Sequence, residues 1–133
     1  ANVRLLLERF RQLRDKTEAE IEVIIVDDNS CDGTEEAVEA SGFPWARCIV
    51  RTMNPGLSPS VLAGFAEATH PVLVCMDCDL SHPPERIPDL VWALERGYRF
   101  ALGSRYVPGA TTDERWGSFV GSTARWLPFS LVH

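Results

Sequence analysis

The sequence has a single lysine, Lys16, and its formal net charge is −6. A surface that follows nucleic-acid phosphates needs a clustered basic face, so this composition argues against a nucleic-acid-binding protein. The sequence also lacks any apolar run of about 18 residues, the length that a helix needs to cross a bilayer. Any phosphate that this chain binds must therefore be met by arginine or by a metal ion.

Cysteine is scarce as well, with four residues at positions 31, 48, 75 and 78. Cys75 and Cys78 form a C-x-x-C pair, but no second pair exists to complete a zinc site. No signal peptide precedes the cysteines, so we expect reduced thiols that pack in the core of a cytosolic protein. With 133 residues, 45% of them hydrophobic and 24% charged, the chain is expected to form one domain over residues 1–133.

Helical and strand-like patterns alternate along most of the chain. The spacing of apolar residues predicts an amphipathic helix over residues 2–17 and another from Ile87 to Gly97, and capping signals predict helices after Thr34 and after Ser58. Short apolar runs predict strands over residues 21–26, 46–50, 72–76 and 100–102. This alternation is typical of an α/β fold with a mostly parallel sheet covered by helices.

The most informative stretch begins with the apolar run Val72–Met76 and ends in Asp77 and Asp79. In extended backbone, residues i and i+2 project to the same side, so both carboxylates can converge on one ligand. Oxygen ligands of this kind suit Mg²⁺ or Mn²⁺, ions that take further ligands from substrate phosphates. The pair therefore predicts a metal-assisted phosphate or diphosphate site, with a solvated acidic turn as the alternative.

Charged residues follow the other predicted strands too. Asp27 and Asp28 come after the strand at 21–26, and Arg105 comes after the strand at 100–102. The carboxyl ends of parallel strands meet at one edge of a sheet, where ligands bind. We therefore expect Asp27, Asp28, the D-x-D pair and Arg105 to converge on one crevice, with the loop from Asn54 to Leu57 close to the ligand.

Four motifs occur in order over residues 21–109. They are Asp27-Asp28-Asn29-Ser30-x-Asp32-Gly33-Thr34, Gly56-Leu57-Ser58 with Gly64-Phe65, Met76-Asp77-x-Asp79-Leu80-Ser81-His82-Pro83-Pro84-Glu85, and Gly103-Ser104-Arg105-Tyr106-Val107-Pro108-Gly109. Together they resemble the dolichyl- or polyprenyl-phosphate mannosyltransferase branch of the family 2 glycosyltransferases. The resemblance implies the GT-A fold and an inverting, metal-dependent transfer of mannose from GDP-mannose to a polyprenyl phosphate, which feeds protein glycosylation.

The resemblance also assigns roles to individual residues. It implies that Asp27 and Asp28 contact the nucleotide, that Asp77 and Asp79 hold Mg²⁺ or Mn²⁺ against the diphosphate, and that Arg105 binds phosphate. Ser81 stands where relatives often have a further metal ligand. By this resemblance Asp79 and Arg105 are the catalytic residues, because the metal ion that Asp79 holds and the guanidinium of Arg105 neutralise charge on the departing GDP, whereas an anionic lipid phosphate needs no strong base.

The resemblance further implies a cellular setting. The enzyme would act at the cytosolic face of a membrane, the endoplasmic reticulum in a eukaryote or the plasma membrane in a prokaryote, with small membrane-anchoring subunits as candidate partners. The family normally begins with a strand that ends in a Pro-x-Tyr-Asn-Glu type motif, and this sequence starts after it. That strand is expected mid-sheet, between the strands at 21–26 and 72–76, so we expect marginal stability.

Two other interpretations stay open at this point. The run from Asp77 to Ser81 also resembles the nucleophile motif of haloacid-dehalogenase-like phosphatases, although that class needs a downstream lysine and none follows Lys16. The other interpretation is an inactive or nucleotide-binding-only fragment of a glycosyltransferase.

Overall fold

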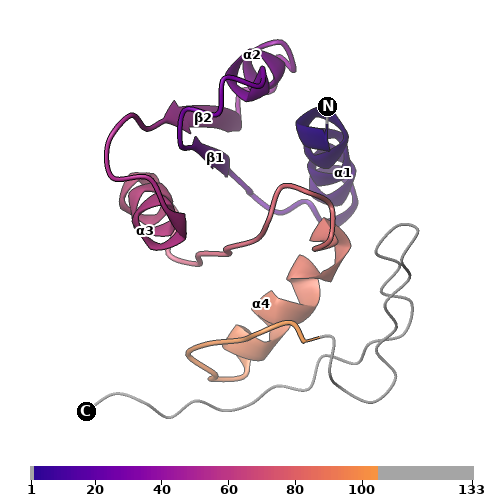
Figure 1. Cartoon of the computed structure of the whole chain (residues 1–133). Coiled ribbons are helices and arrows are strands. Elements are labelled where there is room, and N and C mark those ends of the chain that lie inside the picture. Colours follow the sequence, from indigo (N-terminus) through magenta and orange to yellow (C-terminus); the bar gives the residue numbers. More distant parts are fainter. Residues whose placement is uncertain (1, 105–133) are drawn as a thin grey trace. The chain divides into compact units, whose positions relative to one another are not determined.

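A computed structural model of the chain describes residues 2–104 (Figure 1). The chain divides into two compact units, Ala1–Asp79 and Leu80–His133. No helix among the described residues is long and apolar enough to span a membrane. The first unit contains the sheet and most of the core.

The first unit opens with α1 (Asn2–Thr17), which confirms the predicted amphipathic helix. Its buried residues are the predicted apolar stripe, namely Val3, Leu6, Leu7, Phe10 and Leu13. This spacing places them along one side of the helix, and α1 packs against α2 (Thr34–Glu39). The helix ends before Glu18, which has a φ of 55°, and Arg14 donates a hydrogen bond to the carbonyl of Ile21. The apolar stripe of α1 therefore supplies half of the buried hydrophobic core among the described residues.

The sheet of the described residues has two parallel strands, β1 (Val23–Asp27) and β2 (Ala46–Val50). Their register pairs Val23 with Ala46 and Asp27 with Val50. The helix between them, α2, packs on β2, and α3 (Leu57–Glu67) packs on β1, so that the strands lie between the two helices in Figure 1. The predicted α/β class, with a parallel sheet flanked by helices, is confirmed. Because the strands are parallel, both carboxyl ends lie at one edge.

Gly64 is the point at which α3 approaches β1 most closely. A Cβ atom added to this residue would lie 3.2 Å from Cγ2 of Val26. A larger residue would push the helix away from the strand. The motif Gly64-Phe65 thus has a packing function in this fold.

A polar cluster holds the opposite edge of the sheet, where the strands begin. The carboxylate of Glu22 accepts hydrogen bonds from the amide of Thr69 (2.5 Å), from its hydroxyl (2.8 Å) and from the amide of His70 (3.2 Å). Arg47 donates a hydrogen bond of 2.5 Å to the carbonyl of Glu67. Glu22 and Arg47 together attach the end of α3 to the start of the sheet.

Replacing Glu22 by glutamine is expected to lower the melting temperature at neutral pH. It is also expected to make the melting temperature change less between neutral and acidic pH. The hydrogen bonds from Thr69 hold the pKa of Glu22 below its usual value. A carboxyl whose pKa is depressed in the folded state stabilises the protein above its unfolded pKa, and this stabilisation is lost as the pH falls through the folded pKa. Thermal melts between pH 3 and pH 7 check this, with Glu20→Gln, an exposed neighbour, as the control. Parallel pH profiles for the wild type and Glu22→Gln would contradict it.

The strand predicted over residues 72–76 does not form, so that prediction is wrong. Val72, Leu73 and Val74 are 43%, 43% and 38% exposed. A strand requires a neighbour that pairs with its backbone, and β1 pairs only with β2 among residues 2–104. The strand that the family resemblance places between 21–26 and 72–76 would supply such a neighbour. Among residues 2–104 the run at 72–75 pairs with no strand and is exposed to solvent.

The cysteines differ in part from expectation. All four are free thiols, as predicted, but Cys31, Cys75 and Cys78 are exposed and only Cys48 is partly buried. The expectation of core packing is therefore wrong for these three residues. For Cys75 and Cys78 the reason is the unpaired run that contains or adjoins them, since no second sheet neighbour covers it.

The second unit contains a short 3-10 helix, η1 (Pro84–Arg86), followed by α4 (Ile87–Glu95). Gly97, with a φ of 91°, follows the end of α4 in the left-handed conformation that was predicted. Among the residues of this unit up to Ser104, the buried ones are Leu80, Pro84 and Ala93. The strand predicted over residues 100–102 is wrong, because this segment has no pairing partner in the described part of the chain.

Candidate nucleotide-binding site

The candidate site begins at the shared carboxyl edge of β1 and β2. Asp27 is the last residue of β1 and Asp28 follows it, while Arg51 follows β2. The amide of Arg51 donates a hydrogen bond of 2.7 Å to the carbonyl of Asp27, which extends the ladder by one step. The acidic pair thus lies at the predicted edge of the sheet, and Arg51, which was not singled out, lies at the same edge.

The carboxylate of Asp28 is held by three donors. Oδ2 accepts hydrogen bonds from the amide of Gly56 (2.6 Å) and from the hydroxyl of Ser60 (2.9 Å). Oδ1 accepts one of 2.6 Å from Nη1 of Arg51. The Gly56 amide, more than Ser60 or Arg51, holds the pKa of Asp28 below its usual value, so the carboxylate is ionised at neutral pH.

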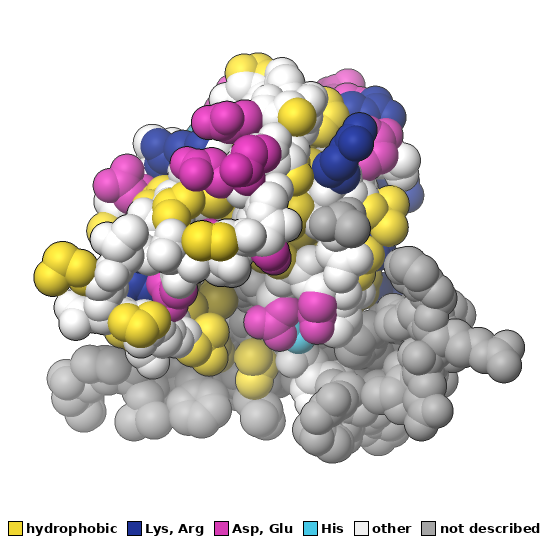
Figure 2. Space-filling view, turned by 45° about the horizontal axis from the view of Figure 1, so that its top comes forward, with side chains coloured by type: hydrophobic (Ala, Val, Ile, Leu, Met, Phe, Trp, Pro, Cys, Tyr) yellow, Lys and Arg dark blue, Asp and Glu magenta, His cyan; other side chains and the backbone are white. Residues whose placement is uncertain are grey.

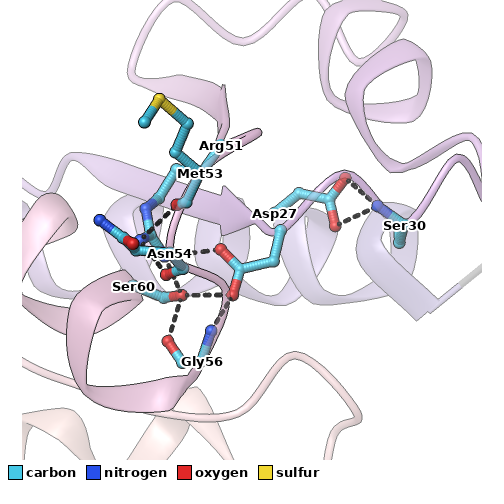
Figure 3. Close-up of polar contacts among 8 residues, drawn as sticks. Asp27, Ser30, Arg51, Met53, Asn54, Gly56 and Ser60 are labelled. Carbon is cyan, nitrogen blue, oxygen red and sulfur yellow. Dashed lines mark hydrogen bonds and ion pairs between the residues drawn. The ribbon is translucent and has the colours of Figure 1, made fainter.

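Arg51 contacts more than one partner (Figure 3). Nη1 also lies 2.6 Å from the hydroxyl of Ser60, and Nη2 donates to the carbonyls of Met53 (3.2 Å) and Asn54 (2.7 Å). Its side chain is only 13% exposed, against 26% for Asp28. The guanidinium therefore links the end of β1 to the loop between β2 and α3.

That loop has an unusual backbone. Asn54 has a φ of 50° and Gly56 has a φ of 140°, a region that side chains with a Cβ rarely adopt. This conformation brings the Gly56 amide to Asp28. Glycine at position 56 is therefore required by the geometry of the loop, which is the loop predicted to lie near the ligand.

Asp27 has a more local role in this structure. Its carboxylate accepts hydrogen bonds from the amide of Ser30 at 3.1 and 3.3 Å, which forms a turn directly after β1. Asp32 then accepts a hydrogen bond of 3.0 Å from the amide of Thr34, the first residue of α2, whereas Gly33 is the N-cap residue of this helix. The prediction that Thr34 itself caps this helix is wrong, because α2 begins at Thr34.

The D-x-D pair lies at the end of the first unit. Asp77 and Asp79 are exposed, and Leu80, which opens the second unit, is buried with a φ of 72°. A positive φ is rare for a bulky residue, and it produces a sharp turn directly after the pair. Ser81 follows this turn and is exposed in the second unit. Exposed carboxylates can accept a hydrated ion that brings its own phosphate ligands.

No group of three or more His, Cys, Asp or Glu side chains among residues 2–104 is arranged to hold a metal ion. Two carboxylates are nevertheless a sufficient protein contribution for Mg²⁺ or Mn²⁺, which usually retain water and bind phosphate oxygens. The residues present therefore fit a hard divalent ion. Arg105, the predicted phosphate ligand, lies outside the described residues.

The charge of the surface is consistent with a binding site that contains few basic side chains. On the face shown in Figure 2, acidic side chains form several groups and basic side chains are fewer. This distribution agrees with the net charge of −6. A large basic surface for a polyanion is not visible on this face.

The sequence analysis missed Arg51 and Ser60 as members of the site. A signal for Arg51 existed, since it directly follows the strand at 46–50 and so falls at the same edge as the acidic pair. Ser60 lies two residues beyond the motif Gly56-Leu57-Ser58, and its role depends on the turn that α3 makes after Gly56.

Comparison with known proteins agrees with this arrangement. The chain is 47% identical over 117 residues to a protein named dolichol-phosphate mannosyltransferase from Saccharomyces cerevisiae, covering 84% of this chain and 43% of that protein. Proteins of the same name from Mycosarcoma maydis (45% over 120 residues, 86% of this chain, 40% of that protein) and Pyrococcus furiosus (48% over 96 residues, 71% and 27%) are also similar. The chain thus spans less than half the length of these curated relatives.

The family model described as glycosyl transferase family 2 matches residues 3–129, nearly the whole chain. This match leaves the phosphatase interpretation of Asp77 and Asp79 without support. The acidic residues that follow β1, the D-x-D pair and the glycine-containing loop before α3 are accordingly parts of a chain that belongs to glycosyltransferase family 2.

Proposed function

We propose that this chain is part of an enzyme that transfers mannose from GDP-mannose to dolichyl or polyprenyl phosphate, with inversion at the anomeric carbon. The observation that carries the proposal is the 45 to 48% identity to three relatives named dolichol-phosphate mannosyltransferase. Residues 1–133 would form part of its single catalytic domain.

Asp28 is suited to bind the nucleotide. A carboxylate has about four lone-pair positions, and Asp28 uses two on Oδ2 and one on Oδ1. Oδ1 can therefore accept one further hydrogen bond, from an N–H of the base or a hydroxyl of the ribose. Asp27, whose carboxylate shapes the adjoining turn, would support the same end of the ligand.

Asp77 and Asp79 would hold a divalent cation, Mg²⁺ or Mn²⁺, with Ser81 as a further ligand. The ion would supply charge neutralisation on the diphosphate when bound. Arg105 would bind phosphate, and with Asp79 it would form the catalytic pair. The acceptor phosphate is already anionic at neutral pH, so the chain must mainly position it against the sugar.

A polyprenyl phosphate acceptor implies work at a membrane surface. We propose the cytosolic face of the endoplasmic reticulum in a eukaryote, or of the plasma membrane in a prokaryote. The three relatives described above are named for dolichol phosphate. Small membrane-anchoring subunits would be natural partners.

A second candidate function is nucleotide binding without transfer. It is favoured by the apolar run at residues 72–76, which is exposed over 72–75, leads directly into the D-x-D pair and pairs with no strand among the described residues. In that case the Asp28 region would still bind nucleotide. Binding and transfer must therefore be measured separately.

Calorimetric titration with GDP-mannose is expected to show binding that is stronger with Mn²⁺ than with EDTA, because an ion bridging the carboxylates and the diphosphate adds favourable contacts. Transfer of labelled mannose to a polyprenyl phosphate would then be assayed on the same protein. Metal-dependent binding without transfer would support the second candidate function. Absence of binding in both conditions would overturn both candidates for this chain.

A further inference from the structure

Arg51 bridges three segments that the sequence keeps apart. It follows β2, its Nη1 pairs with Asp28 after β1, and the same Nη1 lies 2.6 Å from the hydroxyl of Ser60 in α3. Its Nη2 donates to two carbonyls of the loop between β2 and α3.

We propose that Arg51 is a positioning residue for the nucleotide site. It holds the Asp28 carboxylate and the loop from Met53 to Gly56 in one arrangement before the nucleotide binds. This inference rests on the proposed function, because it assigns a purpose to the arrangement around Asp28. It adds a residue that makes no contact with the ligand itself.

Arg51 fixes the orientation of the Asp28 carboxylate. Gly56 and Ser60 both bind Oδ2, so without Arg51 the carboxylate could pivot about that oxygen. The hydrogen bond to Oδ1 removes this freedom and leaves one defined lone pair for a ligand. A group fixed before binding loses less entropy on binding, which raises affinity without a new contact.

Arg51 also stabilises the loop between β2 and α3. Asn54 and Gly56 have positive φ values, a conformation that must be stabilised by its surroundings. Nη2 of Arg51 binds the carbonyls of Met53 and Asn54, on one side of this backbone, and Asp28 binds the Gly56 amide on the other. The loop is thus held from two sides by one ion pair.

Lysine at position 51 could not make all the contacts that arginine makes. The two terminal nitrogens of the guanidinium have a fixed geometry. Here Nη1 contacts the side chains of Asp28 and Ser60, and Nη2 donates to two backbone carbonyls of the loop. A lysine ammonium is a single point charge and cannot reach both sets at once. Arg51→Lys therefore keeps the positive charge next to Asp28 but loses the hydrogen bonds to the loop carbonyls.

Arg47 provides a matched control. It lies within β2, the strand that Arg51 directly follows, and contacts the carbonyl of Glu67 at the opposite edge of the sheet. Arg47→Lys is the same chemical change in a residue whose contacts are with the structural cluster around Glu22. A general loss of stability from an arginine-to-lysine change in or next to β2 would appear in both variants.

The experiment compares wild type, Arg51→Lys and Arg47→Lys by three measurements: thermal melting, hydrogen exchange at the Gly56 amide without ligand, and calorimetric affinity for GDP with Mn²⁺. For Arg51→Lys we expect Gly56 exchange to rise and GDP affinity to fall, each on the order of tenfold, as charge-assisted hydrogen bonds are lost. Arg47→Lys should leave both near wild type. Ser60→Ala, which removes one donor to Asp28 but keeps Arg51, should have a smaller effect than Arg51→Lys.

Unchanged Gly56 exchange and GDP affinity in Arg51→Lys would overturn the inference. Equal losses in Arg51→Lys and Arg47→Lys, in proportion to their melting temperatures, would also overturn it, because they would show a structural role only. A wild type that binds no GDP would overturn the proposed function instead. Gly56 exchange in the unliganded variants would still decide whether Arg51 holds the loop.

Discussion

Replacing Asp79 by asparagine is expected to lower Mn²⁺-dependent affinity for GDP-mannose by about 100-fold or more, and transfer activity with it. Asparagine keeps the size of the side chain but removes the charge that a hard cation requires. Loss of residues that only support a metal ligand already costs 10 to 100-fold in affinity or activity. Calorimetry over a range of Mn²⁺ concentrations measures the effect, and Asp77→Asn should behave similarly.

The control for this prediction is Asp15→Asn. Asp15 is an exposed carboxylate on α1, paired with Arg11 at 2.7 Å, and it has no part in the proposed site. It reports the effect of removing one negative charge from an acidic protein. If Asp79→Asn bound GDP-mannose with the metal dependence of the wild type, the metal assignment would fail, whatever the transfer rate.

Leu7→Ala is expected to destabilise the first unit by about 2–5 kcal/mol, the usual cost of removing a large buried side chain. Leu7 is 0% exposed and lies in the middle of the buried stripe of α1. Small domains have total stabilities of about 5–15 kcal/mol, so this loss is a large share of the total. Thermal melting followed by circular dichroism should show a midpoint lower by about 10 °C or more.

Leu5→Ala on the same helix is the matched control, because Leu5 is 44% exposed. It removes the same atoms from a position where they contact few neighbours, and it should change the midpoint little. Similar midpoints for the two variants would mean that α1 does not pack on the first unit as described. Melting of the wild type well above the range of ordinary mesophilic domains would contradict the expectation of marginal stability.

Sequence patterns predicted best the helices and strands that a local spacing of apolar residues defines. The five buried residues of α1 are the ones that its helical spacing indicated. β1 and β2 were predicted because each is a short apolar run next to a turn. The run at 72–76 has the same local pattern and failed, because strand formation depends on a neighbour that a local pattern cannot show.

The candidate site was predictable to the extent that strand order determines it. Asp27 and Asp28 were expected at the carboxyl edge, and the structure places them there. The partners of Asp28 were harder to foresee, since Arg51 reaches it across 23 residues of sequence and Ser60 across 32. Such contacts depend on the path of the loop and on the side-chain rotamer. Arg105 lies outside the described residues, so its predicted role remains a proposal.

The exposed run at 72–76 has a consequence for the behaviour of this chain in solution. Val72, Leu73 and Val74 are β-branched or aliphatic, carry no charge and lie on the surface, close in sequence to the equally apolar Cys75 and Met76. Short uncharged segments with high strand propensity are templates for pairing between molecules. The run at 72–76, which pairs with no strand among residues 2–104, is therefore the segment through which separate copies would stack into aggregates as their concentration rises.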